Sequence, residues 1–147
     1  MLKLLSLLCF LAAGFLIWQR YAPLPPAPIS LFNPIKLSFP DLNISLPVLT
    51  VPLTSKGVTY EPHDKNLVFY GHSWPNILGP LKKVQLGQSV HLVYANGQTK
   101  KYVTSQIKTV SSNATDILLP TANDQLTIYT CTGFFDIQRL VVVAKPV

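Results

Sequence analysis

The chain has 147 residues, of which 48% are hydrophobic and 12% are charged, and its formal net charge at pH 7 is +6. This length leaves room for one folded domain with one hydrophobic core. From Leu37 onward, nine basic residues are scattered among six acidic ones, a balance too weak and too dispersed for a nucleic-acid-binding surface.

The first twenty residues form the most apolar stretch of the sequence. Between Lys3 and Arg20, residues 4–18 are almost continuously apolar, which is near the lower length limit for spanning a bilayer. Bulky side chains follow this run, where a cleaved signal peptide would carry small residues before its cleavage site. The pattern therefore predicts an uncleaved transmembrane anchor at residues 1–20, with a cleaved signal peptide as the alternative.

A proline-rich segment follows the predicted anchor. Eight of the thirteen prolines lie between Tyr21 and Pro52, and residues 21–36 have the composition of a stiff, extended spacer. We expect residues 37–147 to form the folded domain. Because this domain follows a short N-terminal anchor and contains no second long apolar span, we expect it to lie outside the cytoplasm, held by a single membrane pass.

The predicted domain is all-β. From Ile44 onward, short β-rich runs alternate with turn signals, and helical periodicity is limited to a turn or two near residues 77–84. Asn96-Gly97 predicts a type I′ hairpin turn. This pattern suits a closed barrel or a sandwich. The predicted strands are residues 42–53, 66–71, 89–96, 98–110, 116–120, 125–131 and 139–144.

Cys131 is the one cysteine outside the apolar N-terminal run, because Cys9 lies within that run. A disulfide between the two is therefore not expected. An unpaired thiol in an oxidising compartment is either buried and inert or retained for its chemistry.

Arg139 lies at the start of the predicted strand that follows Cys131, and seven residues separate the two. If the flanking strands pair as an antiparallel hairpin, the thiol and the guanidinium belong to the same surface patch. A neighbouring cation favours the thiolate form of cysteine, and a guanidinium can donate hydrogen bonds to an oxyanion. The spacing therefore indicates a nucleophile with an electrostatic partner.

His72 is the candidate acid and base for this nucleophile. It follows the predicted strand 66–71 just as Cys131 closes its own strand, so parallel pairing would bring both side chains to one end of the sheet. We expect His63 and His91 at surface or packing positions. The three histidines lack the close spacing of metal ligands, and we predict no metal and no cofactor.

Gly71 and His72, the segment TIYTC at residues 127–131, and Arg139 at the head of RLVVVA resemble the sortases, which are membrane-anchored cysteine transpeptidases of bacterial surfaces. The resemblance extends from Leu42 to Val147. It implies an eight-stranded β-barrel, preceded here by the N-terminal transmembrane helix. Among the sortase subclasses, the sequence most resembles classes D and E. Its acidic residues do not match the calcium-binding cluster of one sortase class.

The resemblance also implies a reaction. Cys131 would attack the Thr–Gly carbonyl of an LPxTG-like sorting signal, His72 would act first as acid and then as base, and Arg139 would hold the carbonyl or oxyanion. An amine would then release the thioacyl enzyme and join the surface protein to a peptidoglycan precursor or a pilin. Thr130 matches the threonine of the family motif and is expected to orient substrate.

Two other functions are compatible with the same residues. One is a membrane-tethered, non-catalytic β-domain that binds a surface partner. The other is a thiol hydrolase that uses the same site with water as the acceptor. The sequence leaves open whether a transpeptidase of this kind serves general surface-protein attachment or pilus assembly.

Overall fold

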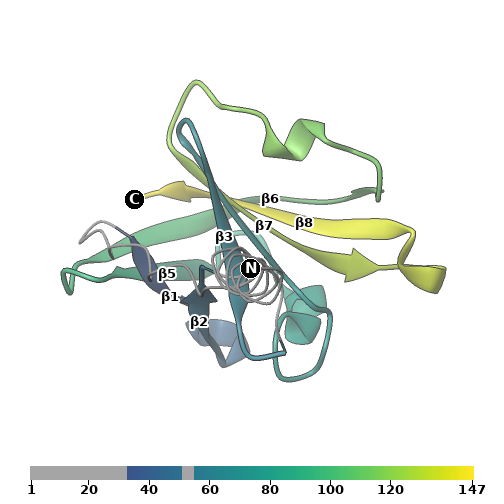
Figure 1. Ribbon diagram of the computed structural model, residues 1–147, viewed down its shortest axis with the longest axis horizontal. Coiled ribbons are helices and arrows are strands. Elements are labelled where there is room, and N and C mark those ends of the chain that lie inside the picture. Colours follow the sequence, from purple (N-terminus) through teal and green to yellow (C-terminus); the bar gives the residue numbers. More distant parts are fainter. Residues whose placement is uncertain (1–32, 51–54) are drawn as a thin grey trace, which may run out of the picture.

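Eight β-strands close into a barrel in the computed structural model of the chain, which describes residues 33–50 and 55–147 (Figure 1). The expected all-β, eight-stranded barrel is thereby confirmed. The strands are β1 (Pro34–Phe39), β2 (Ile44–Leu49), β3 (Val58–His63), β4 (Asn66–Gly71), β5 (Ser89–Tyr94), β6 (Thr99–Ser111), β7 (Gln125–Thr132) and β8 (Gln138–Pro146). Four 3₁₀ turns interrupt them: η1 (Pro40–Leu42), η2 (Gly79–Lys83), η3 (Asp116–Leu118) and η4 (Phe134–Asp136).

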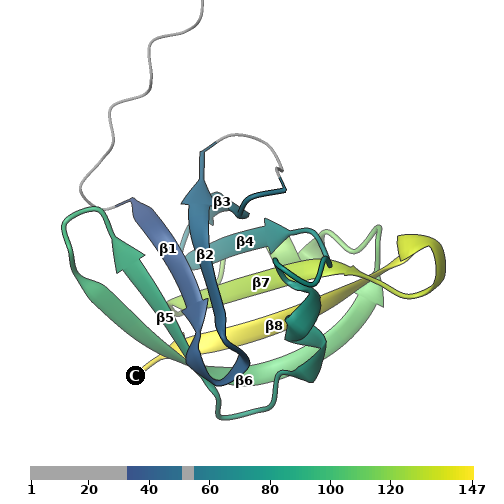
Figure 2. The same ribbon diagram turned by 90° about the horizontal axis from the view of Figure 1, so that it is seen from below.

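The strand order around the barrel is β1-β2-β3-β4-β7-β8-β6-β5, and β5 pairs back with β1. Two pairs are parallel, β2 with β3 and β4 with β7, and the others are antiparallel. Because β4 and β7 run in the same direction, their C-terminal ends lie at the same end of the barrel, next to the β7–β8 hairpin (Figure 2).

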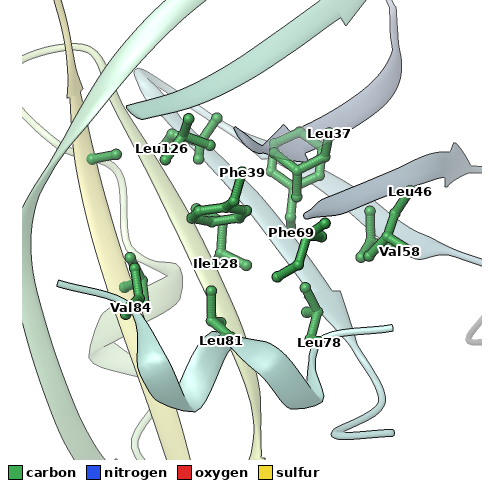
Figure 3. Packing of buried hydrophobic residues seen from close by; sticks show 14 of the residues in the cluster. Leu37, Phe39, Leu46, Val58, Phe69, Leu78, Leu81, Val84, Leu126 and Ile128 are labelled. Carbon is green, nitrogen blue, oxygen red and sulfur yellow. The ribbon is translucent and has the colours of Figure 1, made fainter. Parts of the chain in front are cut away.

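Alternating side chains of the strands fill the barrel. Phe69 on β4 and Leu126 and Ile128 on β7 are fully buried inside it. Leu78 and Leu81, from the segment around η2, point into the same core (Figure 3). Each buried leucine stabilises the fold by about 2 kcal/mol relative to an exposed one. The possible helical turn predicted near residues 77–84 corresponds to η2.

A second, smaller apolar cluster covers the outer face of β7 and β8. Ile117, from the loop of residues 112–124, packs against Val141 and Val143. These strands are therefore buried on both faces at this position, which explains why the sequence of β8 is an unbroken apolar run rather than an alternating one.

Three strand predictions were wrong. β1 (Pro34–Phe39) was missed, because the first predicted strand began only at residue 42 and residues 21–36 had been assigned to the proline-rich spacer. β3 was missed because Glu61 and Pro62 resembled turn residues. Only Asp64 and Lys65, the latter in the left-handed region (φ 55°), form the turn. Residues 116–120 form no strand: Asp116–Leu118 are η3, because the loop docks the apolar Ile117 onto the sheet.

The hairpin at Asn96-Gly97 is present, but its turn is not type I′. The amide of Gly97 donates to the carbonyl of Tyr94, and Gly97 has a φ of +84°. A type I′ turn would also need a positive φ at Asn96, which is not among the residues in that region.

The predicted anchor at residues 1–20 and the spacer up to residue 32 lie outside the described residues. In the part of the chain that the structure describes, no helix has the length and hydropathy needed to cross a membrane.

Candidate active site

Strand register brings the three predicted catalytic residues to neighbouring positions. In the parallel β4–β7 pair, Gly71 lies opposite Thr130, so His72 and Cys131 each follow directly after a paired residue. In the antiparallel β7–β8 pair, Cys131 lies directly opposite Arg139. Neighbouring strands are about 4.8 Å apart. The backbone thus places His72 directly after β4, Cys131 on β7 and Arg139 on β8, at one end of three adjacent strands, as the sequence predicted.

Cys131 lies on the outer face of the barrel. Along β7, the buried Ile128 and Thr130 alternate with Tyr129 and Cys131, so the latter two side chains belong to the opposite face from the core. Cys131 is a free cysteine and is partly exposed. Cys131 is therefore not a fully buried core residue.

Thr130 faces the barrel interior and not the surface on which a substrate would bind. Its side chain is 0% exposed, and its hydroxyl donates a 2.7 Å hydrogen bond to the carbonyl of Gly71. The expected direct contact between Thr130 and substrate does not fit this position. The bond instead ties the end of β7 to the end of β4, one residue before Cys131 on one strand and His72 on the other.

Trp74 fixes one face of the His72 ring. The indole and the imidazole are stacked with 4.3 Å between their centroids and 8° between their planes. The backbone around them is tight, because the amide of Gly79 donates to the carbonyl of Trp74 at 2.8 Å. A Cβ at Gly79 would lie 2.6 Å from that oxygen, so only glycine fits. The two-residue spacing between His72 and Trp74 was the available signal for this contact in the sequence.

Arg139 is held by its own hairpin in this conformation. Its Nη1 donates to the carbonyls of Asp136 and Gln138 at 2.8 and 3.0 Å. The hairpin reaches this shape through left-handed residues, among them Phe135 and Asp136. Among the described residues, the other guanidinium nitrogens make no hydrogen bond. They could donate to a planar acceptor.

A cavity of about 300 Å³ lies beside Arg139 on the outer face. Its floor includes the stacked rings of Tyr70 and Tyr129, whose centroids are 5.1 Å apart. Loop 112–124 supplies a wall. The lining residues are Tyr70, Ser112, Ala114, Thr115, Ile117, Leu118, Tyr129 and Arg139.

The two tyrosines stay neutral near the thiol. Burial, followed by the charges of Glu61 and Tyr70, raises the pKa of Tyr129 to about 12, while Arg139 acts in the opposite direction. Burial and the neighbouring Cys131 likewise raise the pKa of Tyr70. Both phenols are therefore hydrogen-bond donors at neutral pH.

The other two histidines lie away from this site. His63 ends β3, and its Nε2 is 3.9 Å from a carboxylate oxygen of Glu61. His91 lies on β5, opposite Lys101. Within residues 33–50 and 55–147, no three His, Cys, Asp or Glu side chains gather as a metal site would require. The absence of a metal or cofactor requirement stays a prediction.

Comparison with known proteins gives one family. The sortase domain model matches residues 37–147. No curated protein is similar enough to the chain to count as a match.

Solved structures share the fold. Sortase C-1 from Actinomyces oris is 23% identical, with a TM-score of 0.66 over 76% of this chain and 72% of that one. Sortase A from Corynebacterium diphtheriae is 25% identical, with a TM-score of 0.66 over 76% of this chain and 59% of that one. Clostridium perfringens sortase C, solved with the C-terminal cell wall sorting motif, is 20% identical, with a TM-score of 0.66 over 84% and 76% of the two chains. The class D/E-like assignment stays a prediction.

Proposed function

Because the chain belongs to the sortase family, we propose that it is a cysteine transpeptidase that cleaves an LPxTG-like sorting signal and transfers the surface protein to an amine. The observation that carries this proposal is the strand register, in which Cys131 faces Arg139 and His72 follows the Gly71–Thr130 pair. A Clostridium perfringens sortase of the same fold has been solved with a sorting motif, which supports a substrate of this kind.

In the first half of the proposed reaction, the Sγ of Cys131 attacks the carbonyl carbon between threonine and glycine of the signal. Negative charge develops on the carbonyl oxygen, and Arg139 stabilises it. The C–N bond then breaks, and His72 gives a proton to the departing glycine amine. The products are a thioester on Cys131 and a free glycine-bearing peptide.

In the second half, an acceptor amine attacks the thioester carbonyl. His72 takes a proton from the attacking nitrogen, the C–S bond breaks, and Cys131 is restored. The acceptor is an amine of a peptidoglycan precursor or a pilin. We further propose that the protein is a single-pass membrane protein whose catalytic domain lies outside the cytoplasm, as the apolar residues 1–20 indicate.

Product analysis tests the choice of acceptor. The full 147-residue chain in detergent is incubated with an LPxTG-like peptide, with and without triglycine or hydroxylamine, and Cys131→Ala is the control. A transpeptidase diverts the product from the free acid to the amide or hydroxamate, because its site orients an amine better than water. If the product remains the free acid in the presence of every amine tested, the result would favour a hydrolase. No turnover, together with no selective labelling of Cys131 by methanethiosulfonate, would favour a non-catalytic binding domain.

A further inference from the structure

Asn66 is a buried amide at the start of β4, six residues before His72 and 1% exposed. Its Nδ2 donates to the carbonyls of Ile117 and Leu119 at 3.1 and 2.9 Å. Its Oδ1 accepts from the hydroxyl of Thr127 at 2.7 Å and from Nε2 of Gln125 at 3.4 Å. Two donor and two acceptor positions are therefore all in use, which is the full capacity of an amide side chain.

These bonds join β4 and β7 to loop 112–124. In Figure 1 the loop, which contains η3, leaves the end of β6 and comes down beside the tip of the β3–β4 hairpin. That hairpin holds the far end of the loop, since the amide of Thr121 donates to the carbonyl of Asp64 at 3.2 Å. Asn66 holds the middle, at the two carbonyls that flank Leu118.

The same part of the loop forms a wall of the cavity beside Arg139. Ile117 and Leu118 line that cavity together with Tyr129. Displacement of the loop would therefore change the shape of the cavity, while the strand register that sets Cys131 against Arg139 would persist.

We propose that Asn66 is a positioning residue for substrate binding, whose amide fixes loop 112–124 over β4 and β7 and thereby sets the wall of the cavity. This inference rests on the proposed function, in which the cavity receives the sorting signal. Asn66 acts through the loop and touches neither substrate nor the reacting atoms. An amide is needed here because the loop presents two carbonyl acceptors and β7 presents two donors, a combination that neither a carboxylate nor an apolar side chain can satisfy.

Asn66→Asp tests the proposal with almost no change in shape. A carboxylate cannot donate to the carbonyls of Ile117 and Leu119, so the loop loses both bonds. We expect the KM for an LPxTG-like peptide to rise about tenfold at pH 8, since each lost bond contributes modestly. Reaction of Cys131 with a small methanethiosulfonate reagent should stay at the parent rate, because the thiol and its strand are untouched.

Asn123→Asp is the matched control. It introduces the same charge at an exposed position of loop 112–124 itself, and its KM should stay within about twofold of the parent, as for most surface substitutions. On acidification toward pH 5, a protonated carboxyl at position 66 regains one donor, and its burial raises its pKa. The KM ratio of Asn66→Asp to Asn123→Asp should therefore fall toward one. A KM ratio near one over the whole range from pH 8 to pH 5 would overturn the proposal. So would a loss of kcat and of Cys131 reactivity in Asn66→Asp without a rise in KM.

Hydrogen exchange gives a readout that needs no peptide. Amides of residues 112–124 should exchange faster in Asn66→Asp than in the parent at pH 8, while those of β7 should not. If the parent processes no sorting peptide, the proposed function fails, and the loop measurement still decides whether Asn66 holds the wall. Unchanged exchange in the loop would contradict its positioning role.

Discussion

Replacing Thr130 with valine should uncouple the two strands that carry the nucleophile and the acid. The change conserves volume at a site that is 0% exposed, and it removes the donor of the 2.7 Å bond to the carbonyl of Gly71. An unpaired buried carbonyl costs about 1–3 kcal/mol. For a domain of this size, we therefore expect a melting temperature lower by about 8 °C for a loss of about 2 kcal/mol.

The effect on activity should exceed the effect on stability. At a temperature where the Thr130→Val variant is fully folded, freedom at the end of β4 lets His72 drift from Cys131, and a displacement of about 1 Å can cost up to about a hundredfold. We expect kcat for an LPxTG-like peptide to fall at least about tenfold. Thr130→Ser keeps the hydroxyl and should retain most of the rate. A Thr130→Val variant with lower stability and the parent kcat would refute the reasoning, since the bond would then serve the fold alone.

Three further predictions concern residues around the thiol. Arg139→Lys should lower kcat about a hundredfold, because an ammonium lacks the planar fork of donors. A steady-state kcat near that of the parent would mean that Arg139 serves only its hairpin. Trp74→Ala should lower kcat more than it lowers the melting temperature, because the half-exposed indole fixes the ring of His72, and Trp74→Phe should recover part of the rate. The raised pKa of Tyr129, about 12 in the folded protein against 10.0 ordinarily, means that the folded state holds its proton where the unfolded state has lost it. Stability should therefore be intact below pH 10 and fall between pH 10 and 12, and denaturant titration should show a shallower fall in Tyr129→Phe; an equal slope in both proteins would contradict this.

The sequence alone was sufficient to predict the strands that bring Cys131, His72 and Arg139 together. The alternation in residues 125–131 and the apolar run before His72 predicted strands ending at reactive side chains, and two hypothetical pairings then brought Cys131, His72 and Arg139 together. Both pairings are present. What made this possible is that an antiparallel hairpin and a parallel pair each fix which strand ends meet.

Other parts of the site depend on long-range contacts that leave no periodic signal. Asn66 looked like the first residue of a strand, and only the folded chain brings it to carbonyls more than fifty positions away. The orientation of Thr130 follows from which face of β7 meets the core, and the family motif does not give it. η3 was mistaken for a strand because a short apolar run can either pair in a sheet or dock on one.

Mass spectrometry of the intact protein tests the central claim most directly. The full chain is mixed with an LPxTG-like peptide and sampled before and after triglycine is added, with Cys131→Ala in parallel. A transpeptidase should gain the mass of the acyl fragment that ends in threonine, located on Cys131, and should lose it on addition of triglycine as the corresponding amide appears. No adduct under any condition, or an adduct that triglycine does not discharge while water does, would contradict the assignment of Cys131, His72 and Arg139 to amine transfer.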